Sequence, residues 1–472
     1  MNESISNRLA QFAATLEWKN IPADVREQVR LRVLDTTGLI VVGANTQAVR
    51  AAEAFARDYG ASIGGIGGSG PGSTVIGSRT VVPPSIAALV HGVSSHCRDF
   101  DDTFVDSVVH TGSVVMPVAL AMAEALDATP EDFGAAVVAG YEIAARIGGA
   151  AGRKFHEHNL HATGIVGPLA AAVTAGRLMR LSAGQISSSL GLAASMSGGL
   201  MAFTVDGGWS KWLHAGWAAH GGIVAASMAK RGFQGPAFAI EGPKGLYGAL
   251  LHGESIDLSN LTESLGTLWP GAASEFKYYP CAHVTHPYID AVLDLMKRHG
   301  LTADDIERID CYIAPWAAAI VAEPRESRLR FETELEAIAS LPYQLAVAAV
   351  DRQVGLKALD ADQRSRADLS AMAQRIFHVT DPALGRGFDG SVELFTRGAR
   401  YVQNVVMPGS DINRLTQKFV DNVQPVFDRI NPDDGTVVYP RGGQIDAASA
   451  ARLILDGGWQ AVPYILQAIS PG

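Results

Sequence analysis

The stretches PEDFGAAVVAGYEIAARIGGAAG (residues 130–152) and HATGIVGPLAAAVTAGRLM (residues 161–179) decide the fold of this chain. In both, apolar residues recur at steps of three and four, which is the spacing of a helix with a buried face. Alanine and glycine are frequent, and small side chains allow neighbouring helix axes to approach closely. VVMPVALAMAEAL (114–126) and SAGQISSSLGLAASMSGGL (182–200) repeat this pattern. The sequence therefore predicts a compact helical bundle.

The character of the sequence changes near Trp269. ADDIERIDCYIAP (303–315) predicts a helix start followed by a strand, and SVELFTRGARYVQNVVMPG (391–409) predicts a hairpin with Arg397-Gly398 at its tip. NRLTQKFVDNVQPVFDRI (413–430) is helical again. We therefore expect a mainly α fold, in which both chain ends build a large all-helical domain and a smaller α+β domain is inserted. The predicted domain bounds are 1–269 (helical), 270–405 (α+β) and 406–472 (helical).

Composition narrows the functional class. The chain has 472 residues, 47% of them hydrophobic and 18% charged, with a net charge of -10. This balance indicates a globular protein and argues against nucleic acid or an anionic membrane as the partner, because both attract basic surfaces. Cys97, Cys281 and Cys311 are widely spaced and form no CxxC motif, which favours a reducing compartment. With no apolar leader and no apolar run of 18 residues, we expect a cytoplasmic protein without a membrane span.

A glycine-rich loop contains a literal GxGxxG at Gly65, Gly67 and Gly70. A dinucleotide site requires a strand before this motif and a helix opening at its last glycine. Here a helical stretch precedes the motif, and Pro71 with a strand-like segment follows it. We therefore interpret the motif as a surface loop and expect no nucleotide cofactor.

The stretch DFDDTFVDSVVHTGSVV (99–115) places acidic residues next to apolar helical sequence. Three interpretations are open at this point. Asp101 or Asp102 could cap a helix that begins near Thr103. The aspartates could bind Mg²⁺ in the manner of a DDxxD motif. Alternatively, Asp99 could orient a histidine or a lysine that moves a proton.

Three histidines lie close together in HEHNLH, at His156, His158 and His161. They could bind zinc, but His156 and His158 face different sides of a helix, and no carboxylate or cysteine ligand accompanies them. We expect that one of them is functional instead. His161 stands where an apolar helix begins, and a helix N-terminus favours a neutral histidine or a bound anion.

Two further stretches combine a lysine with histidines among aromatic and glycine residues. VDGGWSKWLHAGWAAHGG carries Lys211 and His214, and SEFKYYPCAHVTHP carries Lys277, His283 and His286. Lys211 could simply extend past the neighbouring tryptophans to water. The same composition is equally typical of a pocket that binds a carboxylate.

Taken together, these motifs resemble the MmgE/PrpD family. The matching pieces occur in the family's order over nearly the whole chain: LDTTG at Leu34, DFDDT at Asp99, HTGSVVMPVALAMAE at His110, HATGIVGPLAAA at His161, WSKWLHAGWAAH at Trp209, KYYPCAHVTH at Lys277, SLPYQLAVA at Ser340 and LTQKF at Leu415. The resemblance implies a large helical domain with a small α+β lid and a homodimer. It also implies a small polycarboxylate as substrate and no metal or organic cofactor.

The resemblance also implies a set of site residues. By motif these are Asp99, Thr103, His110, His161, Lys211, Lys277 and Tyr343. His214, His283 and His286, which accompany the two lysines, are assigned to substrate binding. In the expected mechanism His110 or His161 moves the proton and Asp99 orients its partner. The lysines bind substrate carboxylates, and Thr103 and Tyr343 donate hydrogen bonds.

The family includes dehydratases of 2-methylcitrate, decarboxylases of cis-aconitate and epimerases of iminodisuccinate, so the resemblance leaves the reaction open. We expect a lyase that dehydrates or decarboxylates a citrate-like or cis-aconitate-like substrate without a cofactor. An epimerase of a dicarboxylate such as iminodisuccinate, a metal-dependent lyase and a non-catalytic carboxylate-binding protein are the alternatives.

Overall fold

The computed structural model describes residues 3–64, 72–76, 81–330, 332–385, 387–441 and 443–469. The chain divides into two compact units. Unit 1 comprises Met1–Cys97, Asp101–Glu275 and Ile412–Gly472, and unit 2 comprises Arg98–Phe100 and Phe276–Asp411. The domain bounds expected from the sequence stay a prediction. The GxGxxG motif lies outside the described residues.

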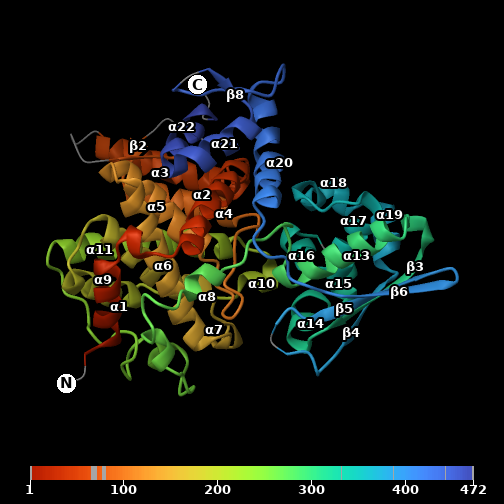
Figure 1. The fold of residues 1–472 in the computed structure, drawn as a ribbon, viewed down its shortest axis with the longest axis horizontal. Coiled ribbons are helices and arrows are strands. Elements are labelled where there is room, and N and C mark those ends of the chain that lie inside the picture. The colour runs from red at the N-terminus through yellow and green to blue at the C-terminus, as the bar shows by residue number, and fades with distance from the viewer. Residues whose placement is uncertain are drawn as a thin grey trace. The chain divides into compact units, whose positions relative to one another are not determined.

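Unit 1 is almost entirely helical (Figure 1). Its helices are α1 (Ile5–Thr15), α2 (Ala23–Gly43), α3 (Gln47–Gly64), α4 (Pro84–His96), α5 (Gly112–Leu126), α6 (Pro130–Ala151), α7 (Lys154–Glu157), α8 (Ala162–Leu178), α9 (Ala183–Ser195), α10 (Phe203–Asp206), α11 (Ser210–Lys230), α12 (Leu246–Leu250), α20 (Ile412–Ile430), α21 (Ala447–Gly457) and α22 (Val462–Ala468). Two short antiparallel pairs accompany them: β1 (Ser73–Thr74) with β2 (Val81–Val82), and β7 (Val437–Val438) with β8 (Gln444–Ile445). The prediction of a mainly α fold is confirmed.

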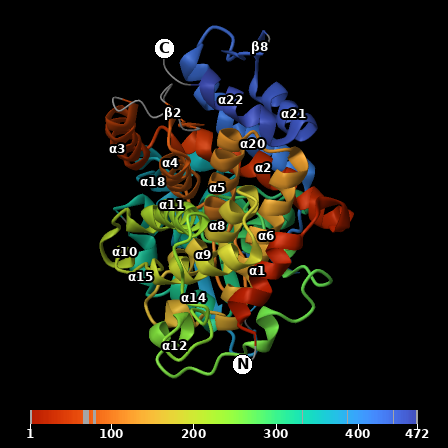
Figure 2. The ribbon, with the colours of Figure 1, turned by 90° about the vertical axis from the view of Figure 1, so that its left-hand side faces the viewer.

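Helix α8 forms the centre of unit 1. Every residue of α8 except Arg177 is buried, as expected for a helix that is apolar on all sides. It lies between α11 and α6, which both pack against it (Figure 2). Helix α11 also packs on α4, where the two backbones touch: a Cβ added to Gly92 would lie 2.6 Å from the Cα of Gly216. The small residues seen in the sequence therefore set the close packing of this bundle.

The C-terminal helices belong to the same unit as the N-terminal ones. Helix α20 packs on α2, and Lys418 Nζ lies 2.6 Å from Asp35 Oδ1 in a buried ion pair. Figure 1 shows the blue α20 and α21 beside the red α2. Since a buried charge without a partner is strongly destabilising, this pair ties together two segments almost 400 positions apart in the chain.

Unit 2 contains one four-stranded sheet with the order β4-β3-β5-β6. The strands are β3 (Ile306–Ile313), β4 (Ile376–Thr380), β5 (Gly390–Thr396) and β6 (Ala399–Asn404), and the helices are α13 (His286–Arg298), α14 (Pro315–Val321), α15 (Arg325–Leu329), α16 (Glu334–Ile338), α17 (Leu341–Asp351), α18 (Ala361–Arg364) and α19 (Ala367–Ala373). β3 pairs parallel with β4 and antiparallel with β5. β5 and β6 form the predicted hairpin, with Arg397-Gly398 between them.

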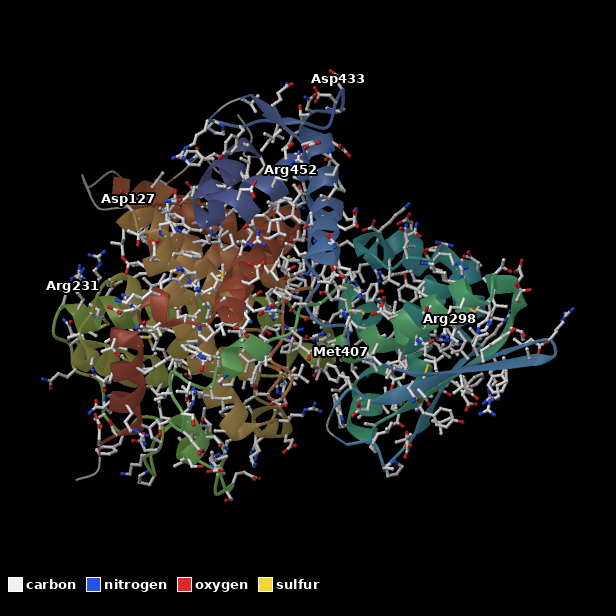
Figure 3. All side chains as sticks on the ribbon, viewed as in Figure 1. Asp127, Arg231, Arg298, Met407, Asp433 and Arg452 are labelled. Carbon is white, nitrogen blue, oxygen red and sulfur yellow. The ribbon has the colours of Figure 1, made fainter. Side chains whose placement is uncertain are left out.

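Charged side chains such as Asp127, Arg231 and Arg452 lie on the exterior of unit 1 (Figure 3). Cys97, Cys281 and Cys311 are buried free thiols. Among the described helices, none is both long and apolar enough to span a bilayer.

Candidate active site

The centre of the site in unit 1 is the carboxylate of Asp101. The Nδ1 atom of His96 lies 3.0 Å from both carboxylate oxygens, and Ser113 Oγ donates a 2.6 Å hydrogen bond to Oδ2. The Nδ1 atom of His110 lies 3.3 Å from the same Oδ2. A carboxylate can only accept, so Nδ1 of His96 carries a hydrogen when it bonds to Asp101. In a neutral ring this leaves Nε2 as the basic nitrogen.

The electrostatics of Asp101 favour its ionised form. Burial by itself would raise the pKa of this carboxyl group, but the charges and hydrogen bonds of His96 and His110 outweigh burial and hold the pKa well below its usual value. Asp101 is therefore a permanent anion that fixes the orientation of two histidine rings.

Local structure explains how these groups meet. His96 is the last residue of α4, a helix buried from Ile86 onward. His110 follows a tight turn in which Phe104 N donates to Val109 O at 2.9 Å and Val108 adopts a left-handed conformation (φ 56°). The backbone N–H of His110 then donates to Thr163 Oγ1 at 3.1 Å, which attaches the turn to the start of α8.

His161 and His214 form the second half of the site. His161 occupies the N-cap position of α8, as predicted, and its Nδ1 lies 3.1 Å from Nδ1 of His214 on α11. The His161 ring stacks on His96 at 5.9 Å between centroids, and the His110 ring lies 6.3 Å away. Gly164 lets the start of α8 lie against the backbone of Gly198, because a Cβ there would lie 2.4 Å from Gly198 O.

Both of these histidines are held neutral. Burial, followed by the neighbouring positive charges of His96 and Lys211, lowers the pKa of His161 well below its usual value. Burial likewise lowers the pKa of His214 to about 4. A neutral imidazole can accept a proton, whereas a charged one cannot, so His161 is suited to act as a base.

Lys211 lies in the first turn of α11 and is only 8% exposed. The alternative in which its side chain extends to water is therefore wrong. Its charge acts on His156 and His161, lowering the pKa of both. Lys211 thus supplies buried positive charge near the histidines, as a carboxylate-binding site requires.

Asp102, the next residue, has an entirely different environment. Its oxygens accept hydrogen bonds from Gly112 N (2.8 Å), Tyr141 OH (2.9 Å) and Ser274 Oγ (2.8 Å). Arg32 Nε lies 3.8 Å from Oδ2. Burial raises the pKa of Asp102, although Arg32 and these donors oppose it. The surroundings of Asp102 are those of a structural group that joins several segments of unit 1.

The structure contradicts the capping alternative, whereas the magnesium alternative stays untested. No helix begins at Thr103, whose backbone instead forms a bridge with Glu275, and the capping prediction there is wrong. Asp102 does cap a helix, but it is α5, at Gly112. Because protein donors already surround the carboxylates of Asp101 and Asp102, the DDxxD arrangement for Mg²⁺ receives no support in unit 1.

The three histidines of HEHNLH do not come together in one cluster, as the zinc alternative for this motif required. Of its three histidines, only His161 belongs to a group whose ring nitrogens lie within 4.8 Å of one another, and its companions there are His96 and His110. His156 is half-buried, and loss of solvent around its ring lowers its pKa to about 4, whereas His158 pairs with Glu254 at 3.5 Å.

Unit 2 holds the pair formed by Asp99 and Lys277. Lys277 Nζ donates to the Asp99 carbonyl oxygen at 2.7 Å and lies 3.1 Å from Oδ1. Both side chains are buried, and Asp99 adopts a left-handed conformation (φ 48°), which aspartate tolerates better than most residues. In unit 2, Asp99 therefore pairs with a lysine.

The other predicted residues of unit 2 have local partners. Tyr343 OH donates to Ala358 O at 2.5 Å, and burial raises its pKa to about 12. His286 Nδ1 accepts from Tyr278 N and its Nε2 faces Cys281 O, both at 3.4 Å. The His283 ring lies 4.8 Å from that of His286. These contacts give His286 and Tyr343 a role within unit 2, and their roles toward a substrate stay predictions.

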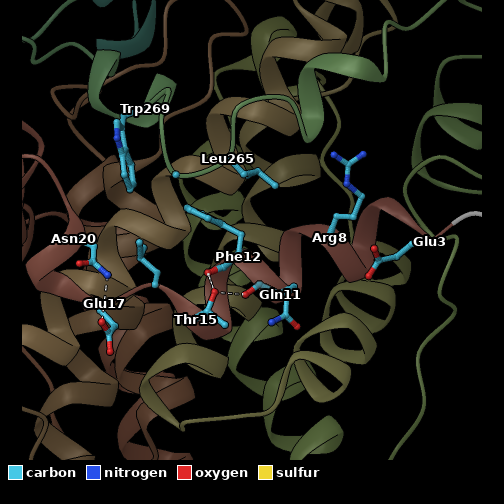
Figure 4. Close-up of a pocket in the computed structure, with 11 residues that line it drawn as sticks. Glu3, Arg8, Gln11, Phe12, Thr15, Glu17, Asn20, Leu265 and Trp269 are labelled. Carbon is cyan, nitrogen blue, oxygen red and sulfur yellow. Dashed lines mark hydrogen bonds between the residues drawn. The ribbon is translucent and has the colours of Figure 1, made fainter.

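A separate pocket lies beside α1 (Figure 4). It is lined by Glu3, Arg8, Gln11, Phe12, Thr15, Leu16, Glu17, Asn20, Leu265, Gly266 and Trp269. It shares no residue with the histidine cluster and includes none of the predicted site residues.

Sequence reasoning missed His96 and considered Asp101 only as a helix cap or a Mg²⁺ ligand. The available signal was a histidine in a helix that is otherwise apolar and five residues before a buried carboxylate. That spacing alone does not show contact, because the chain leaves the helix at His96. Thr103, in contrast, was predicted, and its Oγ1 is buried without a hydrogen-bond partner among the described residues.

The fold and site define a mainly helical protein with a buried histidine–aspartate cluster suited to proton transfer. The MmgE/PrpD N-terminal domain model matches residues 7–259, and the MmgE/PrpD C-terminal domain model matches residues 279–433. The chain belongs to the MmgE/PrpD family. The resemblance proposed from the motifs is thereby confirmed.

Curated relatives include three cis-aconitate decarboxylases. The human protein is 29% identical over 320 residues, which is 66% of this chain and 64% of the relative. The Mus musculus protein is 25% identical over 80% of this chain and 76% of its own length. The Aspergillus terreus protein is 25% identical over 62% of this chain and 61% of its own length. The matched region thus spans less than two thirds of the human and fungal relatives.

Proposed function

We propose that this protein is a lyase that moves a proton next to a carboxylate of a small di- or tricarboxylate. The substrate class is citrate-like or cis-aconitate-like, and the reaction is dehydration or decarboxylation. The observation that carries the proposal is the carboxylate of Asp101 shared by His96 and His110, with neutral His161 beside them. The names of the curated relatives, which are cis-aconitate decarboxylases, support the same substrate class.

The proposed steps use the chain's own residues. His110, oriented by Asp101, or neutral His161 serves as the base or returns the proton. In dehydration the base removes a proton from the carbon next to a carboxylate, and a hydroxyl leaves with a proton as water. In decarboxylation the bond to one carboxylate breaks and CO₂ leaves. The electron pair stays on carbon, and a protonated histidine then supplies the proton.

Both reactions pass through negative charge that spreads onto a substrate carboxylate. Fixed cations stabilise such charge most effectively in a dry site. In the proposal Lys211 and Lys277 bind the substrate carboxylates, Thr103 donates a hydrogen bond, and Tyr343 donates one after its hydroxyl turns away from Ala358 O. The lysines supply the electrostatic stabilisation, so the proposed reaction runs without metal or organic cofactor.

Two other reactions use related chemistry. An epimerase would remove the proton and return it to the opposite face of the same carbon, as for iminodisuccinate. A non-catalytic carboxylate binder would retain the lysines without proton transfer. The position of Asp101 favours catalysis over binding, because a carboxylate placed 3.0–3.3 Å from two histidines is not needed to bind an anion.

The test is proton NMR in D₂O with EDTA present. The panel comprises citrate, methylcitrate, cis-aconitate, tartrate, malate and iminodisuccinate. Loss of water or of CO₂ supports the lyase, and deuterium exchange with inversion indicates the epimerase. No change in any compound contradicts the lyase proposal for this panel and favours the binder. His161→Ala should abolish turnover, whereas His158→Ala, in the same motif but paired with Glu254, should not.

We also propose a cytoplasmic location, which the three free cysteines favour.

We further propose that the chain forms a homodimer through α11. Trp209, Leu213 and Trp217 stand four residues apart on one face and are 45%, 46% and 51% exposed. No charged residue occurs from Trp212 to Ala229. The order Trp-Leu-Trp is symmetric about Leu213, so a two-fold axis there would pair Trp209 with Trp217 of a second copy.

Sedimentation measurements test this interface. Leu213→Glu should convert the dimer to a monomer because it buries an unpaired charge at the axis. Phe233→Glu is the matched control, since Phe233 is 54% exposed and lies beyond α11. A monomeric wild-type chain, or a dimer that survives Leu213→Glu, would contradict the proposal.

A further inference from the structure

We infer that His96, His110 and His161 form a binding site for one divalent transition-metal ion of the zinc class. One ring nitrogen of each residue lies within 4.8 Å of the other two, and all three side chains are buried. All three belong to unit 1. Imidazole nitrogen is a preferred zinc ligand, and three histidines with a fourth position left open is a known zinc arrangement.

Asp101 prepares two of these ligands. Histidines that bind metals usually donate their other ring N–H to a carboxylate, which fixes the tautomer and makes the ligand nitrogen more basic. Asp101 does this for Nδ1 of His96, and its carboxylate lies 3.3 Å from Nδ1 of His110. The Nε2 atom of His96 is buried and has no hydrogen-bond partner in the described chain. A buried polar atom without a partner is costly, and a bound cation would satisfy it.

The local charges suit a weak to moderate site. The Asp101 anion offsets part of the charge of the ion, whereas Lys211 opposes it. Zn–N bonds of about 2.0 Å place tetrahedral ligands roughly 3.3 Å apart, so the rings must close by up to ~1.5 Å on binding.

This site differs from the zinc alternative read from HEHNLH, because it uses only His161 of that motif. It also differs from the proposed reaction, which uses no metal. A bound ion would occupy the nitrogens that the reaction needs for proton transfer. We therefore expect zinc to inhibit turnover, and this consequence rests on the proposed function.

Direct binding tests the site without substrate. The full-length chain is treated with EDTA, dialysed, and titrated with Zn²⁺ in a calorimeter and with Co²⁺ in a visible spectrophotometer. We expect one ion per chain and visible ligand-field bands for Co²⁺. His110→Gln and His161→Gln should each weaken binding at least about 100-fold, and Asp101→Asn about 10–100-fold. His158→Gln is the control and should bind like wild type.

Circular dichroism and thermal unfolding confirm that each variant is folded. His96→Gln is the most direct change, and His161→Gln replaces it if His96→Gln does not fold. Absence of zinc binding, or binding that survives the His110→Gln/His161→Gln double variant, would overturn the site. Such a result leaves the proposed lyase activity intact, because that assay contains EDTA. Full turnover at saturating Zn²⁺ would overturn the inhibitory consequence.

Discussion

Asp101 and Asp102 are neighbours in the chain and are both buried, yet they face two different networks. Asp101 contacts His96, His110 and Ser113, which can exchange or orient protons. Asp102 contacts Arg32, together with backbone and hydroxyl donors whose protons stay in place near neutral pH. The comparison teaches that adjacent residues of one type can divide into a group for chemistry and a group for stability. The side chains that contact each aspartate decide whether it serves chemistry or stability, and the motif does not.

The largest expected effect is on turnover. Asp101→Asn should lower kcat by about 10⁴-fold, roughly 5.5 kcal/mol, because an amide no longer fixes His96 and His110 in the reactive tautomer. The unfolding free energy should change little by comparison. Steady-state kinetics and urea unfolding of the same preparation measure both quantities. An unchanged kcat in Asp101→Asn would contradict the assignment of Asp101 to catalysis and Asp102 to stability.

The matching change in the other network acts on stability. Asp102→Ala should lower the unfolding free energy by about 3–5 kcal/mol, because it leaves Arg32 as a buried charge without its carboxylate. Urea unfolding measures this loss. Folded Asp102→Ala should retain most of its turnover per molecule. If its turnover falls as far as that of Asp101→Asn while stability holds, the assignment of Asp102 is wrong.

One substitution made in each network sharpens the comparison. Ser113→Ala removes a donor to Asp101, and Ser274→Ala removes a donor to Asp102. Hydrogen bonds to a charged group contribute roughly 1.5–3 kcal/mol. We expect Ser113→Ala to reduce kcat about tenfold or more, and Ser274→Ala to reduce mainly the unfolding free energy. If the two variants changed kcat and the unfolding free energy equally, the separation of the Asp101 and Asp102 networks would be wrong.

The smallest predicted effect is on pH dependence. The folded-state pKa of His161 is lowered, so the unfolded chain binds more protons below about pH 6.5. Stability should therefore be complete above that pH and fall as the pH drops, by at most about 1.4 kcal/mol per pH unit for this group. Urea unfolding between pH 5 and 7 should show a shallower slope for His161→Gln. Ser274→Ala should keep the wild-type slope, and a steeper slope in His161→Gln would contradict the sign.

Much of the fold could be predicted from local sequence. The buried helix α8, the start of α2 after Pro22 and the hairpin around Arg397-Gly398 follow from periodicity and turn residues. Periodicity suffices there because each element is defined by neighbours three, four or two positions away. The pairing of α20 with α2 through Lys418 and Asp35 could not be derived in this way, since no local pattern links them.

Only part of the site was predicted from the sequence. His110 and His161 were predicted as members of one site, and their rings lie 6.3 Å apart. His96 was missed, and the expected water-exposed alternative for Lys211 is wrong. The sequence did identify the acidic stretch as unusual, but it could not say that Asp101 faces histidines while Asp102 faces Arg32.

By itself the sequence determined the helical class, the family and the residue types available for proton transfer, because these depend on composition, period and motif. Only the tertiary structure decided which side chains share a hydrogen bond and which charges lose their contact with water. His96 ends α4 and Asp101 follows five residues later, but His110 reaches them only after a turn attached to Thr163. Contacts of that kind depend on the packing of distant helices, and the pKa values of the buried groups depend on those contacts.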